Sequence, residues 1–170
     1  MIKKIRSLVA LSIALSASAA MPEETVDCST NAMSTSIVGV WQLVEASTTL
    51  ADGTIQYPYG QPAAGLFIYT PGGHLSLHLH KNPQGDKVTQ RPSDSELDAV
   101  ARGYIGYYGT WSITGNSVVH HIDGAMSPDR IGQDAERPFM LCENTLELSI
   151  EGSDGRFFYR RLERIETFSE

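Results

Sequence analysis

The sequence has 170 residues, and its 13 Lys and Arg face 20 Asp and Glu, which gives a formal net charge of −7 at pH 7. A chain of this length is sufficient for one domain with a sizeable core. The acidic balance argues against nucleic acid and anionic membrane surfaces as partners, because both carry the same sign of charge.

Residues 1–20 have the pattern of a secretory signal peptide. A basic start precedes the apolar run Leu8–Leu15, and Ala17-Ser18-Ala19 has the small-residue spacing of a cleavage site. The apolar run is too short to cross a bilayer, so no membrane insertion is expected. Residues 21–36 are polar and without period, which predicts a flexible N-terminal lead-in. We therefore expect an exported protein, periplasmic or extracellular.

Residues 37–166 are predicted to form one domain of about eight to ten short strands. Alternating apolar and polar residues mark the strands, and turn signals such as Asp52-Gly53 separate them at intervals of roughly ten residues. The expected strands are 37–50, 55–59, 65–69, 74–80, 107–113, 117–124, 135–142, 145–150 and 156–165. This spacing is typical of a β-sandwich or an antiparallel barrel.

One short helix is expected between the strands at 74–80 and 107–113. Ser93 is in the N-cap position, and Glu96 follows at the capping-box position. Leu97, Val100 and Tyr104 then recur at helical spacing. The segment 125–133 contains Pro and Gly and is expected to be a loop.

The first strand carries the sequence Gly39-x-Trp41, which suits the end of a barrel, where backbones approach closely. A basic run near the C-terminus, which includes Arg164, can bring a guanidinium over the Trp41 indole. If the first and last strands meet, the sheet closes and loses its edges. Gly39, Trp41 and Arg164 are therefore the expected structural residues of the closure.

Two cysteines are present, Cys28 and Cys142. In an oxidising compartment an even pair favours a disulfide, which would tie the lead-in to a late strand. The alternative is a free Cys142 that packs as a small apolar side chain.

Several motifs occur in a recognisable order along the chain. They are Gly39-x-Trp41, Asp52-Gly53, Tyr57-Pro58-Tyr59-Gly60, Gly65 to Gly73, Tyr104-x-x-Tyr107-x-Gly109-x-Trp111 and His120-His121-x-Asp123-Gly124. Together they resemble the bacterial and fungal lipocalin-like domain family over about residues 37–165. The resemblance implies an all-β fold, a small antiparallel β-barrel with an interior cavity. It does not imply one function, because relatives of this shape serve as carriers and as cyclases.

The strand at 74–80 alternates strictly, with leucines on one face and histidines on the other. His78 and His80 would stand about 6–7 Å apart on that face. A third ligand from His120 or His121 would complete a three-histidine metal site. The same spacing is common on solvated faces, so we expect no metal and no other cofactor.

His120 and His121 are adjacent, so they must point to opposite faces of their strand, and one should face the barrel interior. Asp123 shares the face of His121. A histidine beside a carboxylate can act as a general base, which makes His121, Asp123 and His120 the candidate catalytic residues. The alternative is a hydrogen-bonded polar plug inside the barrel.

The aromatic residues offer walls with polar tips, which suit a mostly apolar ligand that has one or two polar groups. The expected ligand-binding residues are Tyr69, Tyr104, Tyr107, Trp111, His120 and His121. Several of them can equally be plain core, because about half of the residues in a period-two strand face away from the interior.

Three functions fit these features. The favoured one is an exported barrel that binds a small apolar or amphipathic molecule. The second is a cofactor-independent isomerase or cyclase that uses His, Asp and Tyr side chains in the cavity. The third is a structural or interaction protein whose barrel is filled with side chains. A large apolar cavity favours the first, convergent polar groups the second, and a filled barrel the third.

Overall fold

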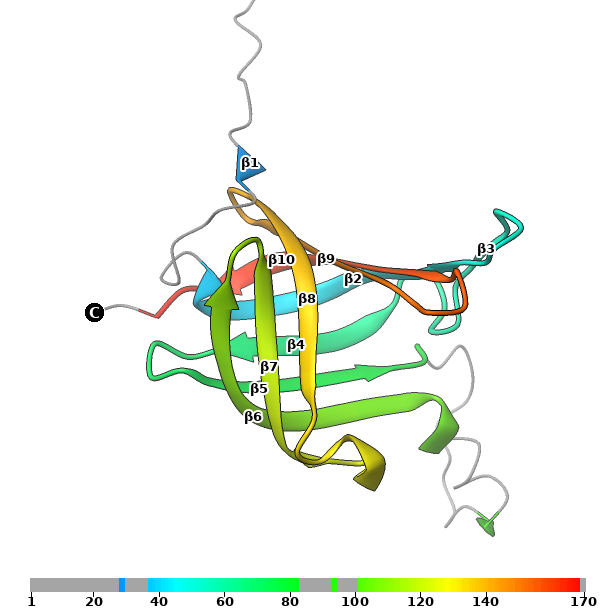
Figure 1. The fold of residues 1–170 in the computed structure, drawn as a ribbon, viewed down its shortest axis with the longest axis horizontal. Helices are drawn as coiled ribbons and strands as arrows, with labels where there is room; N and C mark the ends of the chain where they lie inside the picture. Colours follow the sequence, from blue (N-terminus) through cyan, green and yellow to red (C-terminus); the bar gives the residue numbers. More distant parts are fainter. Residues whose placement is uncertain (1–27, 30–36, 83–92, 95–100, 169–170) are drawn as a thin grey trace, which may run out of the picture.

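A computed structural model describes residues 28–29, 37–82, 93–94 and 101–168. The predicted signal peptide at 1–20, most of the predicted lead-in and most of the predicted helix after Ser93 lie outside the described residues. In the described part, nearly all of the regular secondary structure is β-strand (Figure 1). The elements are β1 Cys28–Ser29, β2 Gly39–Thr49, β3 Ile55–Gln56, β4 Ala64–Tyr69, β5 His74–His80, β6 Tyr104–Thr114, β7 Ser117–Ala125, the 3₁₀ turn η1 Pro128–Arg130, β8 Asp134–Cys142, β9 Thr145–Glu151 and β10 Phe157–Glu166.

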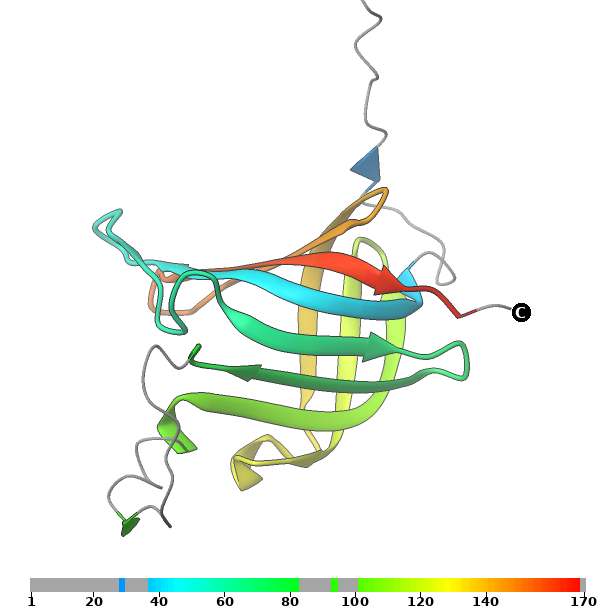
Figure 2. The ribbon, with the colours of Figure 1, turned by 180° about the vertical axis from the view of Figure 1, so that it is seen from behind.

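Eight of the strands close into an antiparallel barrel. Neighbours pair in the order β8, β7, β6, β5, β4, β2, β10 and β9, and the β8–β9 pairing completes the ring. The short strands β1 and β3 attach outside this ring, to β8 and β2 (Figure 2). The sequence prediction of an all-β antiparallel barrel is thus confirmed. The sheet has no free edge strand in the ring, because its first and last strands pair with each other.

The barrel closes where the first and last long strands meet. β2 pairs with β10 along almost its whole length, with Trp41 opposite Arg164. Trp41 is fully buried, its indole N–H donates to the Ile37 carbonyl at 2.9 Å, and the Arg164 guanidinium carbon lies 4.0 Å from the ring centroid. A Cβ at Gly39 would come within 2.8 Å of the Glu166 carbonyl oxygen, so only glycine permits this approach.

Strand β5 shows how period-two alternation builds the interior. Leu75, Leu77 and Leu79 are buried, whereas His74 and His78 are exposed on the outer face. The leucines face inward because their apolar area gains most from leaving water. The histidine face of the strand is therefore the outside of the barrel wall.

Three local predictions need correction. Tyr104 belongs to β6 and not to a helix: it pairs with His80, and its ring stacks on the His80 ring with an interplanar angle of 9°. Pairing with a neighbouring strand overrides the helical spacing here. The strand expected at 55–59 shrinks to the two residues of β3, and the loop expected at 125–133 contains the 3₁₀ turn η1.

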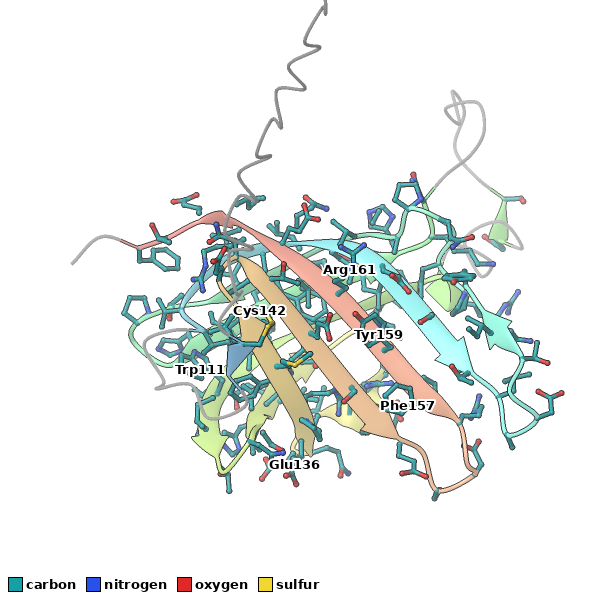
Figure 3. The ribbon with its side chains drawn as sticks, turned by 90° about the horizontal axis from the view of Figure 1, so that it is seen from above. Trp111, Glu136, Cys142, Phe157, Tyr159 and Arg161 are labelled. Atoms are coloured by element: carbon teal, nitrogen blue, oxygen red, sulfur yellow. A yellow bond between two sulfur atoms is a disulfide. The ribbon has the colours of Figure 1, made fainter. Side chains whose placement is uncertain are left out.

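The predicted disulfide between Cys28 and Cys142 is present, across the antiparallel pair β1–β8 (Figure 3). It joins residues 114 apart in sequence. Disulfides persist mainly in oxidising compartments, so this bridge is consistent with an exported protein. Among the described residues, no helix is long and apolar enough to cross a membrane.

Candidate functional site

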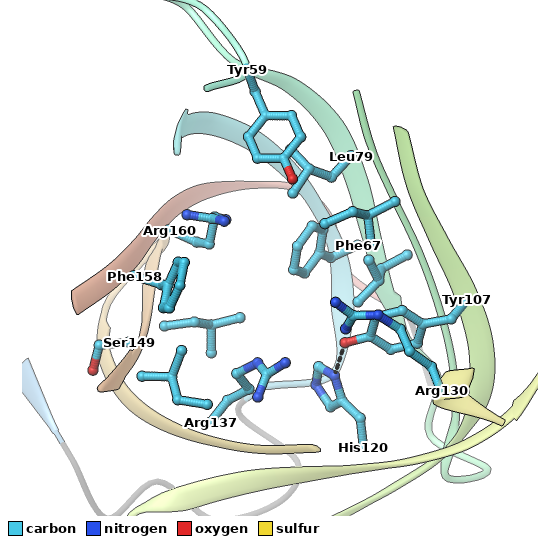
Figure 4. A pocket seen from close by; sticks show the side chains of 14 residues that line it. Tyr59, Phe67, Leu79, Tyr107, His120, Arg130, Arg137, Ser149, Phe158 and Arg160 are labelled. Carbon is cyan, nitrogen blue, oxygen red and sulfur yellow. Dashed lines mark hydrogen bonds between the residues drawn. The ribbon is translucent and has the colours of Figure 1, made fainter. Parts of the chain in front are cut away.

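A cavity of about 380 Å³ lies inside the barrel (Figure 4). Its size falls at the lower end of the range usual for small-molecule sites. Residues from both halves of the chain line it: Tyr59, Phe67, Leu77, Leu79, Ile105, Tyr107, His120, Arg130, Arg137, Leu148, Ser149, Ile150, Phe158 and Arg160. Half of this lining is aliphatic or phenyl side chain, so the walls suit an apolar body.

Strand alternation brings most of these side chains inward. Leu77 and Leu79 come from the inner face of β5, and Phe158 and Arg160 stand two positions apart on β10. Arg161, next to Arg160, instead lies on the outer face, where it forms ion pairs with Glu45 and Glu163 (Figure 3). One strand therefore carries an arginine on each face, and only Arg160 belongs to the cavity.

His120 is the histidine that faces the interior, and it is fully buried. Its Nε2 lies 2.9 Å from the Tyr69 hydroxyl, and its Nδ1 lies 2.7 Å from the Tyr107 hydroxyl. Burial lowers the pKa of His120 to about 3, and the charges of Arg137 and His121 act in the same direction. The imidazole is consequently neutral, with one nitrogen that donates and one that accepts.

The burial of Tyr69 determines which group donates in each of these hydrogen bonds. Tyr69 is buried, and His120 is its hydrogen-bond partner. If His120 Nε2–H donated to Tyr69, the Tyr69 O–H would remain buried without an acceptor, which costs about 1–3 kcal/mol. The favoured arrangement has Tyr69 O–H donating to Nε2 and Nδ1–H donating to the Tyr107 oxygen. The Tyr107 O–H is then available to donate toward the cavity.

Three arginines also reach the cavity, Arg130 from η1, Arg137 from β8 and Arg160 from β10 (Figure 4). The Nη1 of Arg160 donates to the Ser47 and Tyr159 carbonyls at 3.0 and 2.6 Å. Its guanidinium carbon lies 5.5 Å from the centroid of the Tyr59 ring. These contacts fix the guanidinium in place and leave its Nη2 and Nε hydrogens for another acceptor.

Arg137 lies close to the hydrogen-bonded tyrosine and histidine. Burial raises the pKa of Tyr107, while the nearby charges of Arg137 and Arg130 and a hydrogen bond from Arg137 oppose that rise. Burial lowers the pKa of Arg160. The Tyr59 hydroxyl raises this pKa, and the positive charge of Arg137 lowers it. The arginines thus interact across one small volume.

Carboxylates are absent from the described lining of this cavity. The carboxylate contacts found among the described residues involve other side chains: His121, Arg156 and Arg161. The three cavity arginines therefore have no carboxylate partner within 4 Å in the part of the chain that the structure describes. This holds in a protein whose overall charge is negative.

Of the residues singled out from the sequence, Tyr107 and His120 line the cavity. Tyr69 lies behind His120, where its hydroxyl holds the imidazole, and Trp111 packs edge-on against Tyr69 with ring centroids 5.7 Å apart. These four residues form one aromatic group, in which Tyr69, Tyr107 and His120 are buried and Trp111 is partly buried. Tyr69 and Trp111 support the two residues that line the cavity.

The remaining candidates stand on the outer face. His121 pairs with Asp134 at 2.7 Å and with the Ser112 hydroxyl at 3.0 Å, so its carboxylate partner is Asp134 and not Asp123. Asp123 is exposed and borders a separate, open hollow on the barrel surface. His121 and Asp123 therefore do not meet His120 in the cavity.

His78 and Tyr104 also lie outside, where His78 Nδ1 hydrogen-bonds to the Tyr104 hydroxyl. His120 is on the inner side of the wall, so it cannot join His78 and His80 around one ion. Across the described residues, no group of three or more His, Cys, Asp or Glu has the arrangement of a metal site.

Sequence reasoning missed Arg130, Arg137 and Arg160 as cavity residues. For Arg160 a sequence signal exists: it stands midway between Phe158 and Leu162, at the period of two that places all three on one face of the strand. A charged residue at an inward position of a barrel strand indicates either a ligand contact or a buried polar network. For Arg130, at the end of a 3₁₀ turn, we find no comparable sequence signal.

The fold and the site together define a small closed antiparallel β-barrel with a mostly apolar interior cavity and a few polar groups inside. The family model described as "Lipocalin-like domain" matches residues 38–155. The chain therefore belongs to the lipocalin-like domain family, as the sequence motifs indicated.

Comparison with solved structures finds two similar chains. One is a redesigned beta barrel with 16% sequence identity, which aligns over 77% of this chain and 93% of its own with a TM-score of 0.40. The other is a variant of the fluorescent protein UnaG with 12% identity, over 78% of this chain and 99% of its own, with a TM-score of 0.38. No curated protein matches the sequence at a significant level.

The burial of His120 predicts a pH dependence of stability. Its pKa falls from 6.5 to about 3 on folding, so the unfolded chain binds a proton that the folded chain excludes. The free energy of unfolding is therefore unaffected by this group above pH 6.5, and it decreases as the pH falls from 6.5 toward 3. Lowering the pH from 7.5 to 5 should reduce the free energy of unfolding by about 2 kcal/mol through this group.

Urea unfolding at a series of pH values checks this expectation. His120→Gln should remove that part of the slope, whereas the control His74→Gln, on the exposed outer face, should keep it. The range from pH 5 to 7.5 lies above the ordinary pKa values of carboxylates, so carboxylate titration contributes little to the slope of the unfolding free energy against pH. Equal slopes in the parent and His120→Gln proteins would contradict the assignment.

Proposed function

We propose that this protein is an exported binding protein that holds one small, mostly apolar molecule inside its barrel. The cavity of about 380 Å³ is the observation that carries the proposal. A barrel filled with side chains would have supported a purely structural role. The oxidised Cys28–Cys142 pair supports the exported location.

The state of His120 supports binding rather than proton transfer. A general base needs a free nitrogen and a pKa near the working pH. Both His120 nitrogens are within hydrogen-bond distance of tyrosine hydroxyls, and its pKa is held at about 3. The pair His121 and Asp134 lies on the outer face, away from the cavity. The polar groups of the interior are thus better suited to orient a ligand.

Two related dyes test whether the cavity binds small molecules: anilinonaphthalene sulfonate, and phenylnaphthylamine, which has the same aromatic skeleton without the sulfonate. We expect at least one of them to bind with a stoichiometry of about one per chain, measured as fluorescence enhancement, because a cavity of this size takes a single ligand.

The variant Ile105→Trp places a larger side chain in the lining, where it should abolish that binding. Ile165→Trp makes the same change on the exposed end of β10 and should leave binding intact. Circular dichroism establishes that both variants are folded. If neither dye binds the parent protein, or if Ile105→Trp binds like the parent, the cavity is not a binding site.

A further inference from the structure

The cavity of this barrel offers mainly hydrogen-bond donors. Arginine donates and never accepts, and Arg130, Arg137 and Arg160 all reach the lining. His120 uses both nitrogens on tyrosines, and the resulting directions leave the Tyr107 O–H to donate toward the same space. A ligand that fills this space must supply acceptors.

Charge leads to the same conclusion. The described lining holds three guanidinium groups and no carboxylate. Arg160 is largely withdrawn from water, which is costly for an unpaired cation, whereas Arg130 and Arg137 are partly exposed. No described carboxylate pairs with any of the three within 4 Å. The backbone carbonyls of Ser47 and Tyr159 accept hydrogen bonds from Nη1 of Arg160 only, so its Nη2 and Nε donors are not satisfied by these two carbonyls. An anionic group in the cavity would supply the missing partner.

The arrangement has the features of a prepared site. Arg160 is held by two carbonyls and the face of Tyr59, and Arg137 by the Glu136 carbonyl at 2.8 Å. Arg137 precedes Phe139 by two residues on β8, and Phe139 is the last residue on that side to pair with β9. A guanidinium that is already oriented loses less freedom when it forms the planar, two-pronged contact typical of arginine with an oxyanion.

We propose that the ligand is an organic anion: an apolar body packed against the leucines and phenylalanines, with a carboxylate or sulfonate group held by Arg137, Arg160 and the Tyr107 hydroxyl. Arg130 adds positive charge from η1 on the same side of the cavity as Tyr107 (Figure 4). This inference rests on the proposed binding function and specifies the chemical class of its ligand.

The experiment compares the two dyes in the full-length oxidised protein. Anilinonaphthalene sulfonate carries the anionic group and phenylnaphthylamine lacks it, so the ratio of their dissociation constants isolates the charge. We expect the sulfonate to bind at least about tenfold more tightly, because one hydrogen bond to a charged group contributes at least that factor. Decanoate should displace it, and decanol should do so at least about tenfold less well.

Arg160→Gln should weaken binding of the sulfonate by about tenfold or more and change binding of phenylnaphthylamine by less than about threefold. Arg161→Gln is the matched control, since it removes the same charge from the adjacent residue on the outer face. It should leave both dissociation constants unchanged. Arg137→Gln provides a second inner variant with the same expected result, in case the loss of the Arg160 contacts prevents folding.

The outcomes separate the two proposals. If both dyes bind equally and the inner variants behave like Arg161→Gln, the barrel binds small molecules but the anionic class is wrong. If neither dye enters the cavity, the binding function itself fails. If Arg161→Gln weakens sulfonate binding as much as Arg160→Gln, the effect comes from overall charge and the assigned site is overturned.

Discussion

Replacing Trp41 with alanine should lower the free energy of unfolding by about 3–5 kcal/mol. The side chain is fully buried at the junction of β2 and β10, and no small residue can fill the space it leaves. The loss also removes the ring beneath the Arg164 guanidinium, a contact that contributes up to about 2 kcal/mol where the cation is desolvated. Urea unfolding monitored by circular dichroism provides the measurement.

Phenylalanine substitutions separate packing from hydrogen bonding at this position. Trp41→Phe keeps most of the apolar area but removes the donor to the Ile37 carbonyl, so we expect a cost of about 1–2 kcal/mol. Trp111→Phe is the control, because the Trp111 indole N–H is buried and has no hydrogen-bond partner among the described residues. It should cost less than Trp41→Phe. A loss below about 1 kcal/mol for Trp41→Ala would show that this tryptophan is peripheral to stability.

The double variant Cys28→Ser/Cys142→Ser should lose about 4–5 kcal/mol of unfolding free energy. The bridge joins residues 114 apart, so it restricts nearly all of the barrel sequence in the unfolded chain. In the described part of the folded protein it joins the two-residue strand β1 to the end of β8. The effect should therefore come mainly from the unfolded state.

Unfolding of the oxidised protein with and without reductant checks this expectation, and the double variant should be insensitive to reductant. Intact-mass analysis should show a gain of two hydrogen atoms when the parent protein is reduced, because the reductant supplies two electrons and one disulfide becomes two thiols. A loss of less than about 1 kcal/mol would show that the unfolded chain is hardly constrained by the bridge.

Much of the fold could be predicted from the sequence because its signals are local. Alternation along 74–80 separated the leucine face of β5 from its histidine face, although it did not decide which of them is inside, and the Asp52-Gly53 turn defined the end of β2. The count of cysteines and the predicted export indicated the disulfide. The assignment of Tyr104 to a helix is wrong, because helical spacing in a short segment cannot reveal that a neighbouring strand will pair with it.

The site depended on information that local sequence does not contain. Adjacency required His120 and His121 to face opposite ways, but only the paired and closed sheet decided that His120 is inside and that His121 meets Asp134. Arg130, Arg137 and Arg160 come from three separate elements, and each alone resembles an ordinary surface arginine. Strand pattern and turn chemistry determined the barrel, whereas strand register and closure decided which charges share its interior, since those depend on contacts between residues far apart in the chain.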